Sequence, residues 1–202
     1  MQRYIMTSLA LYAASFAAGI AGVSLLSALL SIGALFLIAV FLMKAHSLLI
    51  ALKDKFWDKL SGVWLGGEYS AALWLFLLSG IGSEALLAII SSQFESIAAL
   101  FPIDAAQGEV ISQEVLNKAF ALAALSLGLA ALAAVGLAAW AYLIEVFTRD
   151  VYLIKVATGV GEFRPYSATF YILLSLITLG FLYYFWLYSL WRWISQLTSS
   201  TK

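Results

Sequence analysis

The sequence predicts an all-α fold: a polytopic transmembrane helical bundle of about five spans, in a single domain over residues 1–202. Two observations predict it. First, 64% of the residues are hydrophobic and only 11% are charged, whereas soluble domains are about 45–50% apolar and about 25% charged. Second, residues 4–43 contain no charged side chain. This much apolar surface must face lipid or other helices, so the lipid bilayer is the first predicted partner.

The charge-free segment 4–43 is too long for one crossing. As a single helix it would measure about 60 Å, twice the roughly 30 Å thickness of the hydrocarbon core. We therefore predict two spans, at about 4–20 and 24–43. The glycines of the turn between them permit positive φ, and Ser24 can cap the next helix. A hinge between one span and a tilted half-helix is the alternative.

Residues 45–61 have the pattern of an amphipathic helix. Leu48, Leu52, Phe56 and Leu60 recur every four residues, and most of the charged side chains lie off that stripe. The favoured interpretation is a helix lying in the headgroup region, with its lysines reaching the phosphates. The alternative is that the segment extends the second span into the cytoplasm, since no proline or glycine interrupts 34–61.

Three further spans are predicted from long apolar stretches, at about 69–90, 115–147 and 168–190. The third span can continue as far as Phe101, or it can break at Gly80–Gly82. The fourth is longer than a bilayer needs, so it must tilt or project from the membrane.

Two polar connections separate these spans, a loop at 102–112 and a connection at 148–167. The sequence Thr-Gly-Val-Gly at 158–161 predicts a hinge or turn. It is not a phosphate loop, because the following Lys and Ser/Thr of that motif are missing.

Basic side chains predict the orientation in the cell membrane. They gather in segments 44–59 and 149–164, whereas 92–114 contains four acidic residues and no Lys or Arg. The positive-inside rule therefore places the N-terminus inside and 92–114 outside. Five spans then leave the C-terminus outside, where Arg192 and Lys202 fit the rule poorly.

Glu84 is the strongest candidate for a functional residue, since it lies near the middle of the third predicted span. A charge at that depth costs about 2.5–3.5 kcal/mol on insertion scales. The functional interpretation is an ion, proton or substrate site. The alternatives are a carboxyl hydrogen-bonded inside the bundle or one near the outer end of a shifted span. In the shifted arrangement, Lys118 becomes a candidate partner.

Small residues mark one face of the fourth predicted span. Small side chains at four-residue spacing let helices approach closely in lipid. We expect this face to pack within the chain, and a docking face for a partner subunit is the alternative. The residues form two ridges: Ser126, Ala130, Ala134 and Ala138 on one, and Gly128 and Gly136 on the other.

Aromatic side chains crowd the end of the fifth predicted span. Tryptophan is enriched where a membrane meets water, because its ring is apolar and its N–H is polar. The predicted interface anchors are Trp57, Trp64, Trp186, Trp191 and Trp193.

The residue inventory excludes several kinds of chemistry. With no cysteine and one histidine, one chain cannot form a disulfide, a thiolate metal site or a two-histidine metal site. No catalytic motif is present, so we predict a non-catalytic protein without cofactor or metal. A formal net charge of zero argues against a nucleic-acid partner. Asn occurs once, and depletion of heat-labile residues is one feature of proteins from thermophiles.

Residues 168–194 contain Thr178-Leu179-Gly180 followed by Trp186-Leu187-Tyr188. This segment resembles a span of small uncharacterised prokaryotic multi-span membrane proteins. It departs from their pattern at Leu182, where they have Tyr, and at Ser189, where they have a basic residue. The resemblance implies a similar helical span and carries no implication about chemistry.

The sequence is compatible with two functions. The favoured one is a non-catalytic subunit or scaffold of a larger membrane complex, with other membrane subunits or further copies of the chain as partners. It rests on the missing chemistry, the small-residue ridges and the aromatic excess. The alternative is a small transporter or channel component that uses Glu84 within the membrane.

Overall fold

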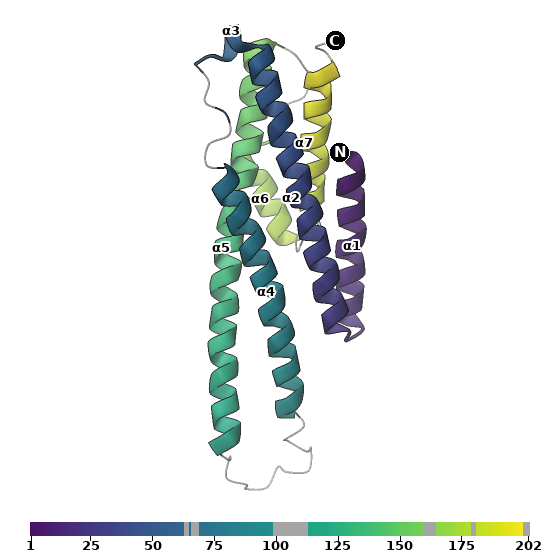
Figure 1. Cartoon of the computed structure of the whole chain (residues 1–202), viewed down its shortest axis with the longest axis vertical. Helices are drawn as coiled ribbons and strands as arrows, with labels where there is room; N and C mark the ends of the chain where they lie inside the picture. Colours follow the sequence, from purple (N-terminus) through teal and green to yellow (C-terminus); the bar gives the residue numbers. More distant parts are fainter. Residues whose placement is uncertain (63–64, 66–68, 99–112, 160–164, 179–180, 200–202) are drawn as a thin grey trace.

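The computed structural model describes the chain except for residues 63–64, 66–68, 99–112, 160–164, 179–180 and 200–202. The described residues form seven helices and no strand, so the all-α prediction is confirmed. Three of these helices are long and apolar enough to cross a membrane, over Ser24–Lys55, Tyr69–Phe94 and Val115–Thr158. They run roughly along the long axis of the molecule, and α5 extends over most of its length (Figure 1). The predicted loop at 102–112 lies outside the described residues.

The first two helices, α1 (Gln2–Ile20) and α2 (Ser24–Lys55), form an antiparallel hairpin. The predicted turn between them is confirmed, and Gly22 adopts φ +77° there. The predicted cap is wrong, because Val23 precedes the first helical residue and no side chain caps α2. Backbone bonds close the turn instead, including one from the Val23 N–H to the Ala18 carbonyl at 2.9 Å.

The favoured prediction of a separate interfacial helix at 45–61 is wrong. The structure has the alternative arrangement, in which the helix of the second predicted span continues through most of this segment. Helix α2 continues unbroken to Lys55, and only the four-residue α3 (Trp57–Leu60) follows. No proline or glycine interrupts α2 beyond Gly33. Leu49 and Leu52 are buried in the core, so the apolar stripe packs against protein and extends the bundle.

Helices α4 (Tyr69–Ala98) and α5 (Gln113–Thr158) form the longest antiparallel pair (Figure 1). Helix α4 runs through Gly80 and Gly82 without the break considered from the sequence. A Cβ added at Gly82 would lie 2.9 Å from the Leu132 Cδ1 atom. This glycine therefore permits close approach of α5 and is not a hinge.

Residues 148–158 are helical, which corrects the predicted polar connection. Helix α5 ends at Thr158, and Gly159 follows with φ +69°, as expected for a glycine after a helix C-terminus. The helix persists because Val151 and Ile154 are buried against the core. The predicted turn is thus placed at Gly159, whereas Val160 and Gly161 lie outside the described residues.

The fifth predicted span, 168–190, is wrong as a single helix. It is divided into α6 (Ala168–Ile177) and α7 (Tyr183–Ser199). The Thr178 Oγ1 accepts a bond from the Leu182 N–H at 3.1 Å and donates to the Leu174 carbonyl at 2.9 Å. This side chain therefore holds the turn between the two helices.

The two short helices run antiparallel. The ring of Tyr171 lies near those of Phe185 and Trp193, and α7 returns toward the end of the bundle that carries α3 (Figure 1). The end of α7 at Ser199 therefore lies at the same end of the bundle as α3.

Candidate functional site

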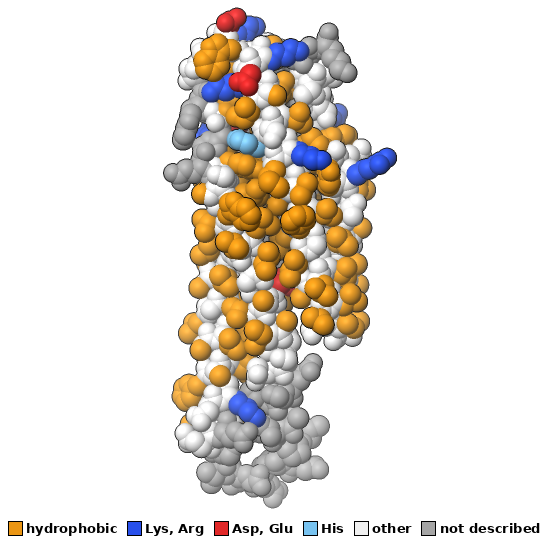
Figure 2. Space-filling view, viewed as in Figure 1, with side chains coloured by type: hydrophobic (Ala, Val, Ile, Leu, Met, Phe, Trp, Pro, Cys, Tyr) orange, Lys and Arg blue, Asp and Glu red, His pale blue; other side chains and the backbone are white. Residues whose placement is uncertain are grey.

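Charged side chains are concentrated at one end of the bundle. On the face seen in Figure 2, Lys, Arg, Asp and Glu gather near α3, and apolar side chains cover the middle. Glu84 lies in the middle of α4, half-buried between helices. Its position in an apolar region of the bundle makes it the centre of the candidate site.

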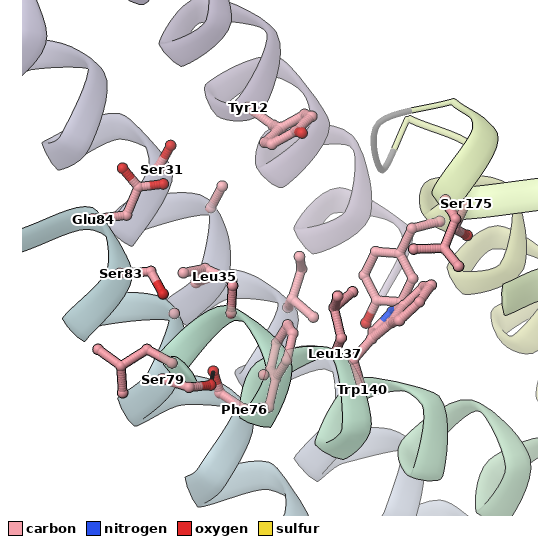
Figure 3. Close-up of a pocket in the computed structure, with 18 of the residues that line it drawn as sticks. Tyr12, Ser31, Leu35, Phe76, Ser79, Ser83, Glu84, Leu137, Trp140 and Ser175 are labelled. Carbon is pink, nitrogen blue, oxygen red and sulfur yellow. Dashed lines mark hydrogen bonds between the residues drawn. The ribbon is translucent and has the colours of Figure 1, made fainter. Parts of the chain in front are cut away.

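The Glu84 carboxyl faces α2 and lies beside the side chain of Ser31 (Figure 3). The Ser31 Oγ lies 2.6 Å from the Ser15 Oγ on α1. The Ser15 Oγ in turn donates to the Ser27 carbonyl at 2.9 Å and lies 3.2 Å from the Ser27 Oγ. A chain of hydroxyl groups therefore runs from a position beside the carboxyl to the α1–α2 turn.

A cavity of about 440 Å³, here called the large cavity, lies between α2, α4, α5 and the tip of the α6–α7 hairpin. Glu84 and Ser31 stand at one end, and Trp140 and Ser175 stand at the other (Figure 3). Most of the wall between them is apolar, with Phe76 among its side chains. The large cavity therefore pairs a hydrocarbon-like interior with a single carboxyl.

A second cavity of about 280 Å³, here called the small cavity, lies next to the α1–α2 turn. Gly22, Ser24, Ser27 and Ser91 line it, and so does Glu84. Glu84 therefore borders both cavities. A carboxyl in this position can exchange a proton or a cation between two separate spaces.

Among the described residues that line the two cavities, none is basic. The predicted alternative partner, Lys118, is not near. Leu86 lies against Gly128 on α5, and Lys118 is ten residues before Gly128, about 15 Å along the helix. Within the described part of the chain, no basic side chain lining these cavities can pair with the Glu84 carboxyl.

The two small-residue ridges of α5 have different surroundings. Gly136 faces α4, where an added Cβ would lie 2.8 Å from the Ser79 Oγ, and Gly128 also faces α4. The other ridge does not pack within the chain, contrary to expectation, because α4 approaches only the glycine side. Its members are all exposed: Ser126, Ala130, Ala134 and Ala138.

The predicted tryptophan anchors differ in how far they are exposed. Trp57 is exposed, with the Lys53 ammonium 5.8 Å from its ring centroid, and Trp64 lies outside the described residues. Trp191 is half-buried. Trp186 and Trp193 are buried in the core, so they cannot serve as interface anchors. Packing of α7 between α1, α2 and α5 covers them.

The sequence interpretation missed the hydrogen-bonded side chains that join α1 to α2 and α7. Ser8 and Tyr184 meet at 3.0 Å between α1 and α7, and Ser15 and Ser31 were not singled out. The signal was present, because serines recur at helical spacing on the facing sides of the two helices. Within the described part of the chain, no three His, Cys, Asp or Glu side chains gather to hold a metal ion.

No protein-family model, curated protein or solved structure matches this chain.

Proposed function

We propose that the chain is an integral membrane protein in which α1, α2, α4 and α5 cross the bilayer. Ser24 and Lys44 are 20 residues apart on α2, about 30 Å along the helix. Tyr69 and Ser91 on α4 are 22 residues apart, about 33 Å. Both lengths match the thickness of the hydrocarbon core. The apolar composition of these two helices also suits a membrane span.

In this arrangement, α6 and α7 form a re-entrant hairpin. Such segments are tolerated at membrane depth where protein buries them or where they line a cavity. Here Ser175, Tyr183 and Tyr184 of the hairpin line the large cavity. The hairpin also returns Arg192 to the end that carries most of the other basic residues, which removes the misfit with the positive-inside rule.

The orientation can be tested with single cysteines, because the chain has no native cysteine. We expect Gln113→Cys to react with an impermeant thiol reagent on intact cells. Ser61→Cys and Ser199→Cys should react only after the cells are opened. Labelling of Ser199→Cys together with Gln113→Cys on intact cells would restore a fifth crossing.

For function, we propose a small transporter or channel component that moves a proton or cation through Glu84. One observation carries the proposal: the Glu84 carboxyl borders both the large and the small cavity. A charge at this depth costs about 2.5–3.5 kcal/mol. A carboxyl that alternately binds and releases a proton or cation would explain why an ionisable side chain is kept at this depth.

The test is a flux assay on proteoliposomes containing the purified chain. We expect Glu84→Gln to abolish flux, because an amide has the size of the carboxyl and cannot ionise. Glu145→Gln is the matched control, since Glu145 is exposed on α5 and lines neither cavity, so its flux should equal that of the unmodified chain. Equal flux from both variants, or no flux from the unmodified chain, contradicts the proposal.

A non-catalytic subunit of a larger membrane complex is the second candidate. The observation that favours it is the exposed ridge of Ser126, Ala130, Ala134 and Ala138 on α5. Small residues at this spacing are typical of helix–helix contacts in lipid. A stoichiometric partner, or a second copy of the chain, that co-purifies from native membranes supports this function.

A further inference from the structure

The large cavity combines features that restrict what it can hold. Its volume of about 440 Å³ falls within the roughly 300–1,000 Å³ of small-molecule sites. Most of its wall is apolar, including Leu35, Phe76 and Leu137. A bare metal ion would be far smaller than this space, and the hydrocarbon wall offers few oxygen ligands. The cavity therefore suits an organic molecule with an apolar body.

The polar end of the large cavity determines the charge of that molecule. Glu84, Ser31 and Ser83 stand together there (Figure 3), and no basic side chain is among the described residues that line the cavity. A carboxylate away from bulk water is stabilised by an opposite charge and by hydrogen-bond donors. Hydroxyl oxygens can also accept bonds from an ammonium group.

The small cavity, which reaches Glu84 from the other side, is also lined by polar groups. The small cavity extends from the α1–α2 turn to Glu84, and the hydroxyls of Ser24, Ser27 and Ser91 line it. These groups can replace the water around an ammonium ion, whereas the apolar wall of the large cavity cannot. The small cavity thus places further hydroxyl groups near the Glu84 carboxyl, on the side away from the apolar wall of the large cavity.

We propose that the large cavity binds an organic cation, a protonated amine with an apolar body. Its ammonium group pairs with the Glu84 carboxylate beside Ser31 and Ser83, and its body extends toward Trp140. This inference rests on the proposed role of Glu84 in transport and names the substrate class of that site.

The test compares three probes that share one body, 4-phenylbutylamine, 4-phenylbutanol and 4-phenylbutyrate. Binding to the full chain in lipid nanodiscs is measured at pH 7 by equilibrium dialysis, and partition into empty nanodiscs is subtracted. We expect the amine to bind about tenfold or more tightly than the alcohol, since a bond to a charged group is worth about 1.5–3 kcal/mol. The carboxylate should bind weakest.

Two pairs of variants locate the site. Glu84→Gln should reduce the affinity for the amine to that for the alcohol, and Glu145→Gln should leave both unchanged. Ala133→Phe should abolish binding of amine and alcohol, because Ala133 lines the large cavity. Ala131→Phe is the control, since Ala131 is exposed on the same helix and is absent from the cavity wall.

Equal affinity for amine and alcohol in the unmodified chain, or a tenfold preference that survives Glu84→Gln, would overturn the inference. Glu84-dependent flux without amine binding would overturn it as well and leave the proposed function standing. Glu84-dependent amine binding without any flux would support the inference and contradict transport.

Discussion

Replacing Trp186 by alanine is expected to lower the free energy of unfolding by about 3–5 kcal/mol. The Trp186 side chain has no exposed surface. Its ring stacks on Tyr183 with centroids 5.5 Å apart and meets the edge of Phe147 at 6.4 Å. Its Nε1 donates to the Thr148 Oγ1 at 3.1 Å, so the substitution also leaves a buried hydroxyl without this partner.

Trp74→Ala is the matched control for this prediction. The Trp74 side chain is 63% exposed, and in a bilayer it would face lipid. Its removal should change the unfolding temperature little, whereas Trp186→Ala should lower it strongly in a mild detergent. Equal shifts for the two variants would show that α7 is not packed in the core.

Most of the helical framework could be predicted from the sequence. The charge-free length of 4–43 required a turn, and Gly22 provides it with positive φ. The extent of α2 was underestimated, although the absence of proline and glycine after Gly33 pointed to a continuous helix. Other helices bury Leu49 and Leu52, and this burial stabilises the extended α2. A single sequence does not reveal those contacts.

The α6–α7 hairpin could not be predicted from composition. Residues 168–190 are as apolar as a membrane span, and an apolar side chain is stabilised equally well by lipid or by neighbouring protein. The hairpin depends on contacts between distant segments. Tyr184 donates to the Ser8 carbonyl at 3.2 Å, and Thr178 holds the turn. Only the folded arrangement brings these groups together.

The candidate site was partly predictable. A carboxyl in the middle of an apolar stretch is visible in any sequence, so Glu84 could be identified. The cavities could not, because their walls come from helices far apart in the chain. The same limit applies to α5, where spacing identified two small-residue ridges but could not decide that α4 covers only Gly128 and Gly136.

Gly136→Leu is expected to destabilise the α4–α5 pair by about 1–3 kcal/mol, the usual cost of overpacking a core. A Cβ at this position would lie 2.8 Å from the Ser79 Oγ. Ser79 is only 3% exposed, and its Oγ donates to the Leu75 carbonyl at 2.6 Å. A Cβ at position 136 therefore requires the Ser79 hydroxyl to give up this bond and turn away, or the two helices to separate.

Ala134→Leu, two residues away on the exposed ridge of α5, supplies the matched control for Gly136→Leu. In the purified chain it should leave the thermal melt unchanged, since the added side chain meets no other helix. Loss of stability in both variants would contradict the arrangement of α4 and α5. If Ala134→Leu instead keeps the melt but loses a partner that co-purifies from native membranes, the exposed ridge is a subunit contact. That result would favour the membrane-subunit function independently of Glu84, because no residue of the ridge lines either cavity.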